Sequence, residues 1–96
     1  SPTFPGGFKA LLKYLAKNIQ YPQEAVKSMI QGKVILQFVI ERDGTIGDLG
    51  VRQGVDPLLD AEAIRVVRSM PRWTPGKKDD KAVRCHFILP VVFRLK

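Results

Sequence analysis

The sequence predicts an α+β domain: a three-stranded antiparallel sheet in the strand order 2-1-3, with two main helices packed on one face and an additional short helix. Three observations lead to this fold class. The last fifteen residues, Ala82 to Lys96, alternate apolar and mixed residues as a strand does. An Asp43-Gly44 pair separates two stretches that read as strands, which is typical of a hairpin. Two other segments repeat apolar residues at helical spacing.

The size and composition fit one small domain, residues 1–96, in which residues 1–7 form a lead-in loop. Apolar residues make up 45% of the chain and charged residues 26%, which is ordinary for a globular domain. The chain begins abruptly at Ser1-Pro2, so we expect a fragment of a longer protein. With a single cysteine, Cys85, there is no internal disulfide, and we expect this residue to be a small buried hydrophobe.

The first helix is expected directly after the Phe4–Gly7 loop, and it should end at Tyr21-Pro22, because a residue before proline disfavours the helical conformation. A short second helix from Pro22 to Met29 follows, with Ala25 and Met29 facing inward. The expected buried stripe of the first helix consists of Phe8, Leu11, Leu12, Leu15 and Ile19. A separate surface stripe consists of Lys9, Lys13 and Lys17.

The first two strands form the hairpin. Lys33 to Glu41 is the most regular apolar stretch, so we expect it to be the central strand. The returning strand, Thr45 to Gln53, contains glycines at 47 and 50 and is expected at one edge of the sheet.

The third helix begins at Asp56-Pro57, an N-cap carboxylate followed by proline at the first helical position, and Pro71 stops it. A rigid turn, Trp73–Gly76, and a charged tip, Lys77–Lys81, lead into the last strand. The expected buried stripe consists of Leu59, Ala63, Val66, Val67 and Met70. Charged residues complement the helix dipole, acids near the start and bases near the end: Asp60, Glu62, Arg65 and Arg68.

In the last strand all odd-numbered residues from Val83 to Leu95 are apolar, so they should form one buried face. A single residue, Pro90, interrupts the strand pattern. Proline lacks the N–H that a central strand needs, but an edge strand tolerates it where that position faces outward. The hairpin fills one side of the central strand, so the last strand takes the other side and leaves a long open edge.

The inventory of side chains argues against an enzyme and against a metal or cofactor site. The only histidine, His86, is adjacent to the only cysteine, Cys85, so the two side chains point to opposite faces of the strand. The net charge of +7 suggests an acidic or anionic partner. Nucleic acid is not expected, because aromatic residues do not alternate with the bases as stacking platforms would.

Five stretches of the chain resemble the C-terminal domain of the TonB family. They are Tyr21-Pro22, Gly32–Val34, Asp43-Gly44, Met70–Gly76 and Leu89–Leu95. The Phe4–Gly7 lead-in resembles the version common in Bacteroidetes. The resemblance covers nearly the whole chain, and the Trp-x-Pro-Gly turn is its most specific part.

The resemblance implies a periplasmic domain of a protein anchored in the inner membrane. Such a protein couples the proton-motive ExbB–ExbD motor, through a part not present here, to TonB-dependent outer-membrane transporters. The family's domain captures the Ton box of the transporter as a strand added beside its own last strand. Similar domains are also fused to membrane peptidases of signal-transducing type, so a sensing or scaffold module is the alternative.

Two groups of residues are the expected partner-binding sites. If Pro90 faces outward, the even-numbered residues present their backbone groups to the guest strand: Arg84, His86, Ile88, Pro90, Val92 and Arg94. The segment just before and at Tyr21-Pro22 matches the family's receptor-contact segment: Asn18, Ile19, Gln20 and Tyr21. The exposed edge also permits a strand-exchanged homodimer.

Overall fold

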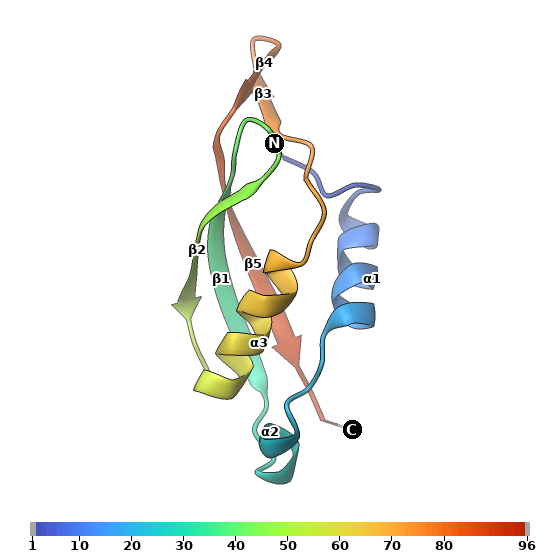
Figure 1. Cartoon of the computed structure of the whole chain (residues 1–96), viewed down its shortest axis with the longest axis vertical. Helices are drawn as coiled ribbons and strands as arrows, with labels where there is room; N and C mark the ends of the chain where they lie inside the picture. Colours follow the sequence, from blue (N-terminus) through green and yellow to red (C-terminus); the bar gives the residue numbers. More distant parts are fainter. Residues whose placement is uncertain (1, 96) are drawn as a thin grey trace.

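The sheet has a central strand with one neighbour on each side (Figure 1). In the computed structural model, which describes residues 2–95, strand β1 (Gly32–Ile40) pairs antiparallel with β2 (Ile46–Gln53) and with β5 (Cys85–Phe93). This order, β2-β1-β5, confirms the predicted order 2-1-3. Ser1 and Lys96, the last residue of the expected strand, lie outside the described residues.

The core lies between the sheet and helices α1 (Phe8–Asn18) and α3 (Pro57–Arg68). Even-numbered residues of β1 and odd-numbered residues of β5 face it, as the alternation predicted. Leu11 and Leu15 of α1 close one side. The sheet contributes Val34, Leu36, Phe38, Ile40, Leu89, Val91 and Phe93, and α3 contributes Leu59, Ala63, Val66 and Val67. None of the helices in residues 2–95 has the length and apolar character to cross a membrane.

The start of α3 follows the sequence signal. Asp56 is the N-cap residue, and its Oδ1 accepts a hydrogen bond of 2.9 Å from the N–H of Leu58. Pro57 occupies the first turn, where its missing N–H removes no helical hydrogen bond. A cap of this kind stabilises a helix by about 1 kcal/mol.

The lead-in loop packs into the core through Phe4, which is 6% exposed. Its ring meets that of Trp73 edge-on at 5.6 Å, and Trp73 in turn packs against Phe38 and Phe87. Two backbone hydrogen bonds between Thr3 and Thr74, of 3.0 and 2.8 Å, hold the loop in place. The lead-in loop therefore lies on the helical side and does not cover the opposite face of the sheet.

Three expected inward-facing residues point outward. Helix α2 (Gln23–Lys27) is shorter than predicted, and Met29 beyond it has a positive φ of 55° and is 75% exposed. Ala25 is fully buried as expected. In α1, Phe8 and Leu12 are 67% and 48% exposed, because no strand lies beneath that flank of the helix.

The charged tip is a hairpin of its own, formed by β3 (Gly76–Lys78) and β4 (Lys81–Val83). Its turn residues, Asp79 and Asp80, have φ values of 52° and 63°. The expected continuous strand from Ala82 is therefore divided, and β5 begins at Cys85. Cys85 is partly buried beside Gly76, where an added Cβ would come within 2.5 Å of its Sγ.

Candidate functional site

The open edge of β5 is regular along its full length. Glu41 donates its N–H to the carbonyl of Thr45 at 2.8 Å, so odd-numbered residues of β1 direct their backbone groups toward β2. The β1–β5 register runs without a shift from Gly32 opposite Phe93 to Ile40 opposite Cys85. Even-numbered residues of β1 therefore bond to odd-numbered residues of β5. The backbone groups of the other β5 residues point to the open edge: His86, Ile88, Pro90 and Val92.

Pro90 lies within this outward set, opposite Ile35. The N–H that it lacks would point away from β1, so the β1–β5 ladder loses no hydrogen bond. Side chains of the same set lie on the sheet face away from the helices. Ile88 and Val92 are 51% and 55% exposed there, which makes this face more apolar than a solvated face needs to be.

The opposite edge of the sheet, along β2, is irregular. The β1–β2 pairing has two register shifts, and Asp48 in β2 has a positive φ of 48°. Bulges of this kind twist an edge and interrupt its row of donors and acceptors. The fold therefore offers one regular edge for an added strand, and it is β5.

Arg84 binds acids of its own chain. Its Nε lies 2.6 Å from Oε1 of Glu41, and its Nη2 lies 3.2 Å from Oδ2 of Asp48. The hydrogen bond to Glu41 raises the pKa of Arg84, and the charges of Glu41 and Asp48 add to the effect. Arg94, just beyond β5, is exposed.

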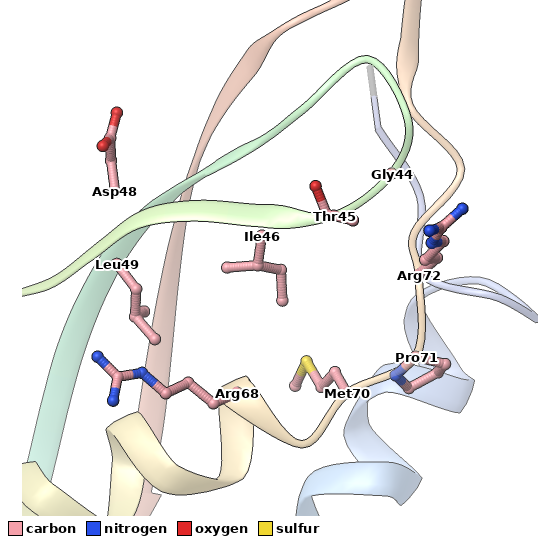
Figure 2. Close-up of a pocket in the computed structure, with 9 residues that line it drawn as sticks. All are labelled: Gly44, Thr45, Ile46, Asp48, Leu49, Arg68, Met70, Pro71 and Arg72. Atoms are coloured by element: carbon pink, nitrogen blue, oxygen red, sulfur yellow. The ribbon is translucent and has the colours of Figure 1, made fainter.

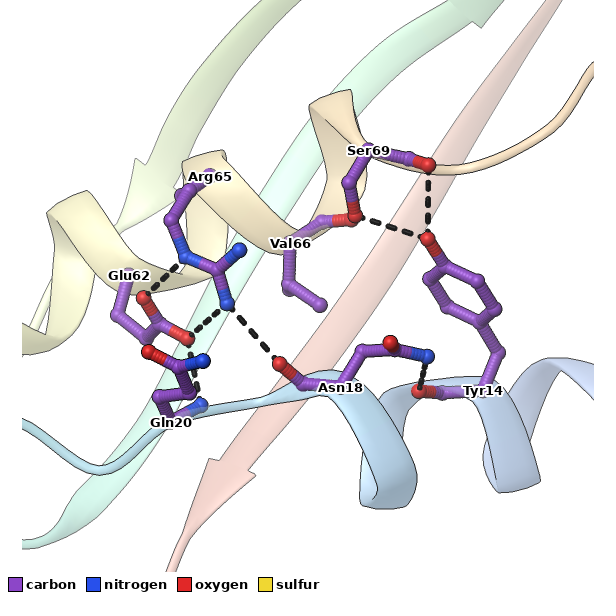
Figure 3. Close-up of polar contacts among 7 residues, drawn as sticks. All are labelled: Tyr14, Asn18, Gln20, Glu62, Arg65, Val66 and Ser69. Carbon is purple, nitrogen blue, oxygen red and sulfur yellow. Dashed lines mark hydrogen bonds and ion pairs between the residues drawn. The ribbon is translucent and has the colours of Figure 1, made fainter.

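The segment after α1 is fixed to α3 by a polar network (Figure 3). Arg65 donates to both carboxylate oxygens of Glu62 at 2.7 Å, and through Nη2 to the carbonyl of Asn18 at 2.9 Å. Glu62 also accepts the backbone N–H of Gln20 at 2.6 Å. These bonds hold the expected receptor-contact segment at a defined position on α3.

Glu62 is 9% exposed, although its place near the helix start suggested only a dipole role. Burial acts to raise the pKa of Glu62, but the hydrogen bonds from Arg65 and Gln20 outweigh it and leave the pKa below its ordinary value. A carboxylate six residues beyond an N-cap carries no sequence signal of burial, because its partners lie 42 residues away in Gln20 and three residues away in Arg65.

The two predicted groups of site residues meet at Ile19. A groove of about 220 Å³ lies between α1 and β5. Its lining residues are Leu12, Leu15, Ala16 and Ile19 on the side of the helix, and Pro90, Val91 and Val92 on the side of the strand. Tyr21 points elsewhere: its ring packs edge-on against Phe93 at 5.5 Å, and its hydroxyl donates to the carbonyl of Ile30. Tyr21 is thus part of the scaffold in this structure.

A second hollow, of about 390 Å³, opens between β2 and the loop after α3 (Figure 2). The side chains of Ile46, Leu49 and Met70 point into it, whereas Asp48 points away. No pair of nucleophile and base lines this hollow. Within residues 2–95, no three His, Cys, Asp or Glu side chains come together as a metal ion would require.

Comparison with known families identifies the domain type. The family model described as "Gram-negative bacterial TonB protein C-terminal" matches residues 17–95. Two NMR solution structures of the Helicobacter pylori TonB C-terminal domain are similar in fold, each at 22% identity. One has a TM-score of 0.68 and covers 88% of this chain and 77% of that chain. The other has a TM-score of 0.69 and covers 92% of both. No significant match is found among curated protein sequences.

Proposed function

The chain belongs to the family of Gram-negative bacterial TonB protein C-terminal domains, and we propose that its β5 edge binds the Ton box of an outer-membrane transporter as an additional strand. Domains of this family are not enzymes, are typically periplasmic, and transmit energy to TonB-dependent outer-membrane transporters. In this proposal the protein is anchored in the inner membrane and connects to ExbB–ExbD through a part outside this chain.

The observation that carries the proposal is the contrast between the two edges of the sheet. β5 presents outward backbone groups in an unshifted register, with only the N–H of Pro90 missing, whereas β2 is interrupted by two register shifts. Strand addition needs such a row, because the affinity comes from main-chain hydrogen bonds. A guest strand on β5 would also extend the sheet by one strand. The helices cover only one face of this sheet.

The energetic scale fits a coupler that engages and releases. The outward set supplies the N–H groups of His86, Ile88 and Val92 and the carbonyls of these residues and Pro90. At about 0.5–1.5 kcal/mol for each bond, the ladder contributes on the order of 3–10 kcal/mol before the guest's ordering cost. A micromolar complex requires about 8 kcal/mol, so contacts from side chains must contribute.

The charges around the edge favour an acidic guest or an acidic surface near it. Arg94 is exposed beyond the end of β5, and the lysine stripe of α1 is exposed as well. Arg84 is already bound to Glu41 and Asp48. An acid of the transporter at Arg84 would therefore have to share or replace these partners, which makes Arg94 the more available cation.

Amide hydrogen exchange tests the proposal directly. Synthetic peptides that copy the N-terminal segments of the same organism's outer-membrane transporters are added, and exchange is followed by NMR. We expect new protection at His86, Ile88 and Val92, because their N–H groups gain carbonyl partners. Protection at Ile46 on the β2 edge instead, or no change at any of these amides, would reject β5 as the site.

A second copy of this chain is the competing occupant of the same edge. The peptide experiment is therefore run at protein concentrations where sedimentation shows a monomer. If the three amides are protected without peptide and lose protection on dilution, a homodimer occupies the edge.

A further inference from the structure

We propose that the outer apolar flank of α1 (Phe8, Leu12, Ala16 and Ile19, the α1 flank) is a wall of the guest-strand site and selects apolar side chains at every second position of the guest. The inference rests on the proposed function, since it requires a strand added to β5. It assigns a binding role to Phe8, Leu12 and Ala16, which belong to neither of the two predicted groups of site residues. Ile19 already belongs to the second group.

The first observation is that the apolar sector of α1 is wider than the sheet beneath it. Leu11 and Leu15 are 1% and 8% exposed, but Phe8 and Leu12, on the adjoining flank, are 67% and 48% exposed. Figure 1 shows α1 beside β5, on the side of the sheet away from β2. The α1 flank therefore overhangs the space that a fourth strand next to β5 would occupy.

The second observation is the groove between this flank and β5. Leu12, Ala16 and Ile19 line it from the helix, and the Pro90–Val92 segment lines it from the strand. The side chains that the helix contributes to this groove are all apolar, so a polar or charged guest side chain that faces α1 would lose its hydration without gaining a side-chain partner there. An apolar side chain would gain from burial together with the exposed parts of Leu12 and Phe8.

The lengths of the helix flank and of a short guest agree. From Phe8 to Ile19 a helix rises by about 16 Å, and about five strand residues at ~3.3 Å each cover the same distance. Successive side chains of a strand point to opposite faces. About three of the five guest side chains would therefore face α1, and the remainder would lie on the open face beside Ile88 and Val92.

The charge of α1 indicates which residues of the guest should flank its apolar positions. No acid occurs in the chain before Glu24, and Lys9, Lys13 and Lys17 are all exposed on the outer side of the helix. An added segment with glutamate or aspartate next to its apolar positions would meet this unbalanced positive charge. The occupant that fits is thus an extended peptide segment with alternating apolar residues and acidic ends.

The wall is largely additional to the matched family segment. The family model covers residues 17–95, whereas α1 spans Phe8–Asn18. Most of the α1 flank lies before the segment that the family model matches, although one of the two similar solved structures covers 92% of this chain.

The test uses two synthetic eight-residue peptides with glutamate at both ends. One has valine at every second position with threonine between, and the other has threonine throughout. Threonine is close to valine in shape and in strand preference, so the pair differs mainly in polarity. Affinities are measured by NMR titration for the natural chain, for Leu12→Ser and for Leu58→Ser. Leu58 is the matched control, a leucine on α3 that is 40% exposed.

We expect Leu12→Ser to weaken the valine peptide about tenfold and the threonine peptide less than twofold, and Leu58→Ser to change neither. Equal effects of Leu12→Ser on both peptides, or no effect on either, would overturn the inference. The proposed function would still stand if the β5 amides are protected when a transporter peptide is added. Failure of the valine peptide to bind β5 would also overturn it, because that peptide carries everything the α1 flank is proposed to select. The proposed function would then be judged by the transporter peptides.

Discussion

Pro90 lies directly opposite Ile35 in the β1–β5 register, with the position of its missing N–H on the open side of the sheet. A valine at this position would supply one more donor to a guest strand. We expect Pro90→Val to strengthen peptide binding by about fivefold, the equivalent of about 1 kcal/mol for one hydrogen bond. Titration calorimetry measures this change.

The same variant should leave the free energy of unfolding nearly unchanged, because no bond to β1 is involved. It should also increase self-association, since the edge becomes continuous. Weaker peptide binding together with a large change in stability would show that Pro90 faces β1.

The ion pairs of Arg84 lie on the surface. Arg84 is 52% exposed in its side chain, and its partners Glu41 and Asp48 are 31% and 76% exposed. We expect Arg84→Gln to lower the free energy of unfolding only slightly, with the loss becoming smaller at high salt. Urea unfolding at low and high ionic strength checks both points. A loss that is large and independent of salt would contradict an exposed ion pair.

Glu62 should stabilise the fold in a pH-dependent way. Its folded-state pKa is below the ordinary value of 4.5, so its contribution is fully present above that value and is lost as the pH falls through the folded-state pKa. We expect Glu62→Gln to cost about 1–3 kcal/mol at neutral pH, and the difference from the natural chain to shrink under acid conditions. Thermal unfolding followed across the acid range measures this. A difference that stays constant with pH would exclude the ionised carboxylate as its cause.

Position 44 requires glycine because of its backbone conformation and because Trp73 lies close to it. It has a φ of 87°, and an added Cβ would lie 2.1 Å from the carbonyl oxygen of Trp73. We expect Gly44→Ala to destabilise the domain by about 2 kcal/mol or more, because the hairpin must move from the Trp73 turn. Gly50→Ala is the control, since a Cβ there meets nothing within 4 Å. Equal losses in the two variants would refute this account.

The β3–β4 hairpin has a turn of two aspartates in the left-handed region, at Asp79 and Asp80. An Asn-Gly pair suits such a turn better. We expect the double change Asp79→Asn and Asp80→Gly to stabilise the hairpin by about 1 kcal/mol. Slower exchange of the Lys78 and Val83 amides would report it, and unchanged or faster exchange would count against strain in the turn.

The local elements were largely predictable because their signals are contained in neighbouring residues. Asp56-Pro57 marks the start of α3, and the alternation from Cys85 to Phe93 marks β5 with its buried parity. The 2-1-3 order followed from the hairpin and from Pro90, which together leave one position for the last strand. The turn residues of the charged tip include no glycine, so the sequence lacks the usual local signal for the β3–β4 hairpin.

The contacts between distant segments were not predictable. Helical periodicity places Phe8 and Leu12 in the apolar sector of α1, and the sequence by itself therefore predicts their burial. Only the tertiary structure shows that the sheet ends at β5, so that these side chains overhang an open edge. In the same way, the helix dipole explains why an acid occurs at position 62, but it does not predict that Glu62 is buried. The burial arises because Gln20 and Arg65 pack around this side chain.

Period-two alternation and a single proline are properties of consecutive residues, so the order of amino acids specifies which backbone groups can form a regular edge. The surroundings of that edge arise from the packing of the whole chain. It brings α1 alongside β5, binds Arg84 to Glu41 and Asp48, and bulges β2 at the other side. These features depend on packing between elements far apart in the chain, and such packing has no local pattern from which it could be read.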